Sequence, residues 1–152
     1  MTIFNQLENT NQVIPQSGRL LAIDVGTKRI GIALSDQSRL IATPKNIINR
    51  QSNQKDFEKI KKLIEEYQAI GIVIGIPVNM DGSPCFMTNF SIQFSENLDE
   101  FLEKKLPIFF SDERLSSFEA RELNNSSLSR KRDKHCDDIA ASIILQGFLD
   151  SL

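Results

Sequence analysis

Residues that form disulfides or bind zinc are scarce in this chain of 152 residues, which has two cysteines and one histidine. Cys85 and Cys136 lie far apart and form no CxxC pair, so the spacing indicates neither a disulfide framework nor a zinc site. His135 beside Cys136 adds too few ligands for a structural zinc ion. We therefore interpret both cysteines as reduced thiols in a cytoplasmic protein.

Long apolar segments are missing as well. No run approaches the roughly 18 apolar residues that would span a membrane, and residues 1–17 lack the basic and apolar parts of a secretory signal. Because residues 1–17 are polar and aperiodic, we expect a flexible N-terminal extension there, followed by a single domain over residues 18–152. Hydrophobic residues make up 40% of the chain and charged residues 25%, which excludes a disordered or fibrous protein.

Charge is distributed unevenly, although the net charge is only −2. Lys and Arg outnumber Asp and Glu in residues 1–62, whereas Asp and Glu outnumber Lys and Arg in residues 63–152. Such asymmetry indicates a basic surface beside an acidic site. Solvated surface charge without any partner explains the same counts equally well.

Hydrophobic patterning predicts the order of the secondary structure. A short glycine-containing connection predicts that the first two strands form an antiparallel hairpin, and the later strand–helix–strand units predict parallel pairing with helices on both faces. We therefore expect a three-layer α/β fold with a mixed five-stranded sheet. The expected strands are residues 20–23, 30–34, 40–48, 70–76 and 108–110, and the expected helices are residues 53–68, 86–102, 115–124 and 136–150.

Several carboxylates stand where a carboxylate is costly. Asp24 ends the apolar run 20–23, and Glu113 follows the strand 108–110. Because ligand sites of open α/β sheets gather at the carboxyl ends of the strands, we expect Asp24, Glu113 and the loop at Asn79 to share one edge. Together with Asp137 at the start of the last helix, these oxygen ligands predict a Mg²⁺ or Mn²⁺ site. Such a site supports two-metal phosphodiester hydrolysis.

Each acidic residue also has a purely structural explanation. Asp24 can cap the turn at Gly26 through a local hydrogen bond, and Glu113 can be a first-turn helix residue paired with a neighbour. Asp137 can be a helix N-cap. Basic residues close to these acids in sequence could hold a phosphate backbone: Lys28, Arg29, Arg114, Arg130, Lys131, Arg132 and Lys134.

The basic residues nearest the last helix fall in residues 126–134, which we expect to be a polar loop. Helical periodicity then distinguishes between the two acids that follow. At about 100° per residue, Asp137 lies along the edge of the apolar face formed by Ala140 and Ile144, whereas Asp138 lies farther round. We therefore expect Asp137 to be the metal ligand and Asp138 a bystander.

Four ordered motifs resemble the YqgF/RuvX family of Holliday-junction-resolvase-like proteins. The resemblance spans residues 19–149, and it implies an RNase H-like fold with Asp24, Glu113 and Asp137 as the acidic triad. The chain departs from the family pattern at residues 84–87, which are more apolar, and at Asp138, where a small residue is common. The motifs are residues 23–31 with Ser35 and Asp36, residues 73–83, residues 112–116, and residues 137–141 with 144–146.

The resemblance implies a cytoplasmic, metal-dependent endonuclease that matures the 5′ end of the 16S ribosomal RNA precursor. Its partners would be RNA and pre-ribosomal particles, and the protein would be a monomer or a weak homodimer. Two alternatives remain open, a branched-DNA resolvase and a nucleic-acid-binding scaffold with little activity. An actin-like ATPase shares a motif like residues 24–27, but it needs a second such domain and leaves residues 79–83 and 112–114 unexplained.

Overall fold

The structure is a computed structural model that describes residues 17–113 and 132–152, with side chains from Ile139 onward in the second range. The expected helix over residues 115–124 lies outside the described residues, as does almost all of the expected N-terminal extension. The same holds for Arg114, Arg130 and Lys131. None of the described helices is long and apolar enough to cross a membrane.

Five strands form one mixed sheet in the order β3-β2-β1-β4-β5. β1 pairs with β2 and β2 with β3 in antiparallel fashion, whereas β1 with β4 and β4 with β5 are parallel. This confirms the predicted hairpin and the predicted parallel units. The strands are β1 (Leu20–Val25), β2 (Arg29–Ser35), β3 (Ala42–Asn49), β4 (Gly71–Ile76) and β5 (Ile108–Asp112).

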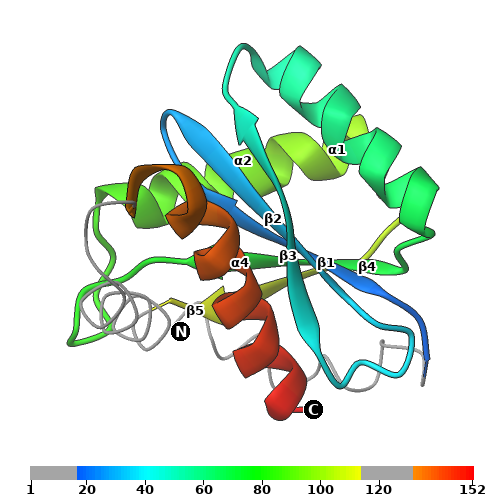
Figure 1. Ribbon diagram of the computed structural model, residues 1–152. Helices are drawn as coiled ribbons and strands as arrows, with labels where there is room; N and C mark the ends of the chain where they lie inside the picture. Colours follow the sequence, from blue (N-terminus) through cyan, green and yellow to red (C-terminus); the bar gives the residue numbers. More distant parts are fainter. Residues whose placement is uncertain (1–16, 114–131) are drawn as a thin grey trace.

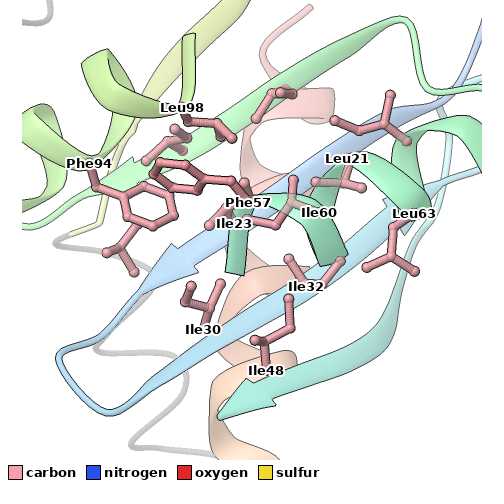
Figure 2. Packing of buried hydrophobic residues seen from close by; sticks show 14 of the residues in the cluster. Leu21, Ile23, Ile30, Ile32, Ile48, Phe57, Ile60, Leu63, Phe94 and Leu98 are labelled. Carbon is pink, nitrogen blue, oxygen red and sulfur yellow. The ribbon is translucent and has the colours of Figure 1, made fainter. Parts of the chain in front are cut away.

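Helices cover both faces of the sheet, so the predicted three-layer fold is confirmed. The helices are α1 (Asn53–Tyr67) and α2 (Phe86–Phe101), which lie on one face, and α4 (Arg132–Asp150), which crosses the other (Figure 1). Alternate residues of the buried strands point to opposite faces. Leu21 and Ile23 of β1 pack under α1 and α2 (Figure 2), whereas Leu20 and Ala22 pack against α4.

The apolar stripe of α1 holds this helix on the sheet. Phe57, Ile60 and Ile64 recur at helical spacing and are buried. The Ser52 side chain accepts a hydrogen bond from the Lys55 amide at 3.2 Å, which caps the N-terminus. The helix ends where Gln68 adopts a left-handed conformation with φ 54°.

The prediction that β1 ends at Ile23 and gives way to a turn at Asp24 is wrong. The strand continues to Val25, because Asp24 pairs with Gly31 and Val25 with Ile30 across the hairpin. Asp24 is therefore part of the sheet, where its backbone is held on a rigid element.

The predicted C-terminal boundary of the polar loop, at Lys134, is also wrong. α4 begins at Arg132, so Arg132 and Lys134 lie in its first turn. The prediction relied on the lack of apolar residues in this segment. Residues 132–136 contain neither Pro nor Gly, and Lys and Arg have good helix propensity, so the helix extends beyond its apolar face.

Candidate active site

Asp24 lies on the α4 face of the sheet, at the edge where the parallel strands end. Its backbone follows the alternation of Leu20 and Ala22, which pack against α4, and its side chain is half-buried. On one side its strand neighbour is Gly31. On the other, Ile23 pairs with Ile74 in parallel register, so Gly75 is the next neighbour of Asp24. The carboxyl group thus stands between two glycines.

Glu113 reaches Asp24 from the end of β5. Its amide donates a hydrogen bond to the Ile76 carbonyl at 3.2 Å, and its side chain is only 9% exposed. Burial, the nearby charge of Asp24 and a hydrogen bond with the Asp24 carboxyl raise the pKa of Glu113 to about 10, with smaller contributions from Cys85 and Asp112. Without a cation, Glu113 therefore keeps its proton near neutral pH and shares it with Asp24.

Gly75 provides the space in which Glu113 lies. A Cβ atom built on Gly75 would stand 3.3 Å from both Cγ and Cδ of Glu113, and 2.5 Å from Cδ1 of Ile144 on α4. A side chain here would therefore press on the carboxyl pair and on the helix above it. Sequence reasoning assigned Gly75 no role, because the need for a glycine arises only from the packing of β5 and α4 over β4.

The position of Asp137 follows from the path of α4. Asp137 precedes the buried Ile144 by two helical turns, so both lie on the same side of the helix. Farther along, Gln146 donates to the Leu40 carbonyl at 3.0 Å and accepts from the Ala42 amide at 3.0 Å. Ala42 begins β3 at the opposite edge of the sheet. The N-terminal half of α4, with Asp137, therefore runs toward the edge that carries Asp24.

The alternative explanation that Asp137 is a helix N-cap is wrong. α4 begins at Arg132, which places Asp137 in the second turn, beyond the positions that a cap occupies.

The chemistry of the donor set fits a hard divalent cation. Asp24 and Glu113 place two carboxyl groups in contact, and one of them is buried, an arrangement that two anions tolerate only with a proton or a cation between them. Carboxylate oxygens are the ligands that Mg²⁺ and Mn²⁺ prefer. Among the side chains that the structure describes, no three His, Cys, Asp or Glu residues form a metal-binding group. The third predicted ligand, Asp137, lies in α4 before those side chains begin.

Three of the predicted substrate-binding residues, Lys28, Arg29 and Asn79, follow the ends of β1 and β4 at this edge. Lys28, in the turn after β1, and Arg29, the first residue of β2, are both exposed. Asn79 follows β4, where its amide nitrogen donates to the Ser83 hydroxyl at 2.9 Å and to the Pro84 carbonyl at 3.4 Å. Asn79 thus closes a tight loop after β4.

Sequence reasoning missed an ion pair that braces the turn after Asp24. Arg50 Nε lies 3.1 Å from the Asp56 carboxylate, which is fully buried, and Arg50 Nη1 donates to the Gly26 carbonyl at 3.4 Å. The guanidinium also lies over Phe94, 5.3 Å from the ring centre. An acidic residue next to the apolar stripe of α1 was the available signal, since Asp56 directly precedes Phe57.

Cys85 stands at the N-terminal end of α2, and its charge is among those that raise the pKa of Glu113. Its thiol lies 3.4 Å from the Thr88 hydroxyl and 3.7 Å from the Pro77 carbonyl. Hydrogen bonds with Thr88 lower the pKa of the thiol. The interpretation of Cys85 as a free thiol is confirmed, but its place beside the carboxyl pair was not predicted.

Asp36 has a structural role, although it belongs to the same sequence motif as Asp24. It follows β2 at the opposite edge of the sheet, where its carboxylate accepts hydrogen bonds from the Leu40 and Ile41 amides at 2.8 and 3.0 Å and from the Ser38 hydroxyl. These donors lower the pKa of Asp36 to about 2. Hydrogen bonds to the ionised form thus stabilise Asp36 as an anion without any cation.

Comparison with known proteins adds independent information about the chain. A family model described as RuvX, Holliday junction resolvase, matches residues 18–151. A protein of Rhodobacter capsulatus is 44% identical over 141 residues, which cover 91% of this chain and 87% of that protein. A protein of Thermoanaerobacter pseudethanolicus is 42% identical over 136 residues, which cover 88% and 96%. Both carry the provisional name pre-16S rRNA nuclease.

Several solved structures that share the fold are resolvases. RuvC of T. thermophilus, in complex with a Holliday junction substrate, aligns with a TM-score of 0.58 at 8% identity and covers 88% of this chain and 94% of its own. The yeast mitochondrial Holliday junction resolvase Ydc2 aligns with a TM-score of 0.54 at 13% identity and covers 95% and 84%. At such identities the likeness concerns the fold, which confirms the expected RNase H-like architecture.

Proposed function

The chain belongs to the RuvX family, and from this premise we propose that it is a metal-dependent endonuclease that matures the 5′ end of the 16S ribosomal RNA precursor in the cytoplasm. The RNA substrate is suggested by the provisional name of its relatives. The observation that carries the chemistry is the contact between Asp24 and the buried Glu113 at the carboxyl edge of the parallel strands.

Asp24, Glu113 and Asp137 would hold Mg²⁺ or Mn²⁺. When bound, the ion supplies positive charge that polarises the phosphodiester and acidifies water. Asp24 is fixed by strand pairing and Glu113 by its place between β4 and α4, so both oxygens are held before the substrate arrives. Because the pKa of Glu113 is raised to about 10, cation binding would displace its proton.

The substrate backbone would be held by basic and polar groups around this edge. Lys28 lies in the turn between β1 and β2, Arg29 begins β2, and Asn79 lies in the loop after β4. Phosphate contacts of this kind fix the position of a nucleic acid without reading its sequence. We place in the same role Arg114, Arg130, Lys131, Arg132 and Lys134.

A second candidate function is the resolution of branched DNA. It is favoured by the description of the family model and by the fold shared with resolvases. A metal-binding carboxyl pair can support phosphodiester hydrolysis in RNA and in DNA, so a cleavage assay must distinguish the two substrates.

Asp24→Asn tests the proposal with a matched control. In the presence of Mn²⁺, we expect this variant to lose cleavage of a 16S precursor fragment by about 100-fold or more, because a cation stabilises the transition state by several kcal/mol. Its melting temperature should stay unchanged or rise. Asp36→Asn makes the same change in the same hairpin, at the opposite edge, and should keep its cleavage rate.

Full cleavage by a clean Asp24→Asn preparation would overturn the proposed site. A protein that cleaves a four-way DNA junction but leaves the RNA precursor intact would instead establish the second candidate function.

A further inference from the structure

A polar groove runs along the edge strand β3, away from the carboxyl pair. It has a volume of about 420 Å³, and Ile48 and Leu63, both buried, form its floor. Its walls carry polar side chains from β3, from the segment between β3 and α1, and from α1. These are Asn46, Asn49, Gln51, Lys59 and Lys62.

The two exposed sides of α1 differ in charge, and the basic side borders the groove. At about 100° per residue, three lysines, Lys55, Lys59 and Lys62, share one side of the helix with one acid, Glu66. Two acids, Glu58 and Glu65, share the other side with one lysine, Lys61, so only the first side has a net positive charge. The packing agrees with this division. Lys59 and Lys62 line the groove with β3, but Glu65 lines a separate pocket with the C-terminal end of α2.

The groove opens at the same edge of the sheet as the carboxyl pair. β3 is antiparallel to β2, and β2 is antiparallel to β1, so β1 and β3 end at the same edge. Asn49 of the groove pairs with Arg29, one of the residues proposed to hold substrate. Two strand spacings, about 10 Å, separate β3 from β1. The groove lies on the α1 face of the sheet, whereas Asp24 lies on the α4 face. A polynucleotide held at Asp24 would therefore pass around the strand ends at Arg29 to enter the groove.

We propose that this groove binds the phosphodiester backbone of the RNA substrate outside the cleavage site, an inference that rests on the proposed function. Lysine ammonium groups act as point charges toward phosphates, and Asn and Gln amides can both donate and accept hydrogen bonds with phosphate and ribose. The residues that line the groove include no aromatic ring on which a base would stack. The groove therefore binds RNA without preference for its sequence.

The test compares two pairs of charge-neutralising substitutions in an Asp24→Asn background without divalent cations, so that the RNA stays intact. Lys59→Gln with Lys62→Gln removes the groove charges. Lys61→Gln with Lys105→Gln removes the same charge from the pocket on the other side of α1. The probes are a 16S precursor fragment and an unrelated RNA of equal length, and the dissociation constant is measured over a salt series.

The groove pair should raise the dissociation constant of both RNAs by about tenfold at 0.1 M salt and lower the salt slope by about 1.5, as expected for two lost phosphate contacts. The control pair should change neither. Lys59→Arg with Lys62→Arg should retain the affinity, which separates lost charge from a damaged fold.

If both pairs of substitutions weaken RNA binding equally, the effect comes from the net charge of the protein and not from the groove, and the proposal is overturned. Unchanged RNA affinity in the groove pair would overturn it too, as would be found if an acidic protein segment occupied the groove. The two proposals fail separately. If the wild type cleaves RNA but the groove substitutions leave RNA affinity unchanged, only the proposed groove function is disproved. If the groove substitutions weaken RNA binding but the wild type does not cleave RNA, the proposed nuclease activity is disproved.

Discussion

The two faces of the sheet bury different kinds of residue. Under α1 and α2, the strands contribute isoleucines and leucines along their whole length, and Phe57 packs edge-on against Phe94 with ring centres 5.2 Å apart (Figure 2). Under α4, the strands contribute fewer buried residues, and two of them, Ala22 and Ala33, are alanines beside the larger Leu20, Val73 and Phe109. The α4 face then ends in the contact between Asp24 and Glu113.

This difference separates stability from chemistry. A face that is apolar throughout contributes most of the hydrophobic stabilisation. The α4 face keeps two carboxyl groups in contact, which costs stability whenever no cation is bound. The apolar face therefore offsets the cost of the carboxyl pair on the α4 face. Substitutions on the apolar face should lower stability and leave the cleavage activity of the folded protein unchanged, whereas substitutions at the carboxyl pair should lower cleavage with little loss of stability.

The largest effect should come from Phe57→Ala, on the face under α1. Removing this ring, which is 4% exposed, should lower the free energy of unfolding by about 3–5 kcal/mol, while the folded fraction still cleaves RNA. Chemical denaturation measures the loss. Phe86→Ala is the control, because Phe86 is 74% exposed and should change stability by less than about 0.5 kcal/mol. Equal losses would contradict the assigned core.

Next in size is Asp137→Asn, on the helix that covers the other face. We expect cleavage to fall by about 100-fold, equal to about 2.7 kcal/mol in activation free energy, with little change in stability because Asp137 does not cap α4. Asp138→Asn, one residue on, should stay active. The reverse result in a cleavage assay with Mn²⁺ would make Asp138 the third ligand.

Gly75→Ala should have an intermediate effect that lowers both the stability and the cleavage rate. The new methyl group would press on Ile144 and on Glu113, so we expect a stability loss of about 1–3 kcal/mol together with slower cleavage. Adding Ile144→Val removes the Cδ1 atom in the way and should restore stability, but not the position of Glu113 or the rate.

Gly71→Ala is the matched control on the same strand. Its Cβ would meet Leu20 and Phe109 at 3.1 and 3.3 Å, far from the carboxyl pair. Slower cleavage in Gly71→Ala, after correction for the folded fraction, would contradict the specific role of Gly75.

Glu113→Gln is the variant of this series that should gain stability, when no divalent cation is bound. Unfolded Glu113 ionises near its ordinary pKa of 4.5, whereas the folded group keeps its proton up to a pKa of about 10. The wild type therefore loses stability as pH rises from 4.5 toward 10. The glutamine variant lacks this loss, so its melting temperature should exceed that of the wild type at pH 8 and match it at pH 4.

Mg²⁺ should then raise the melting temperature of the wild type more than that of Glu113→Gln. Glu96→Gln on α2, an exposed glutamate, is the control and should show neither effect. A wild type whose advantage over Glu113→Gln grows with pH would contradict the buried carboxyl pair.

What the sequence determined by itself was local pattern and its direct geometric consequences. Buried strands such as residues 71–76 are uniformly apolar, and α1 repeats apolar residues every three or four positions, so the order of elements follows from the periods of strands and helices. Parallel pairing then brings the ends of β1, β4 and β5 to one edge. For that reason Asp24 and Glu113 could be predicted as neighbours before any contact was known.

Only the tertiary structure decided which groups meet and what that does to them. The hydrogen bond of Glu113 with Asp24, the space left by Gly75 under Ile144, and the ion pair of Arg50 with Asp56 each join residues whose approach depends on strand register and helix packing. The start of α4 at Arg132 likewise lies outside any apolar period. Local sequence carries no record of such contacts, because burial and charge proximity arise only when distant elements pack together.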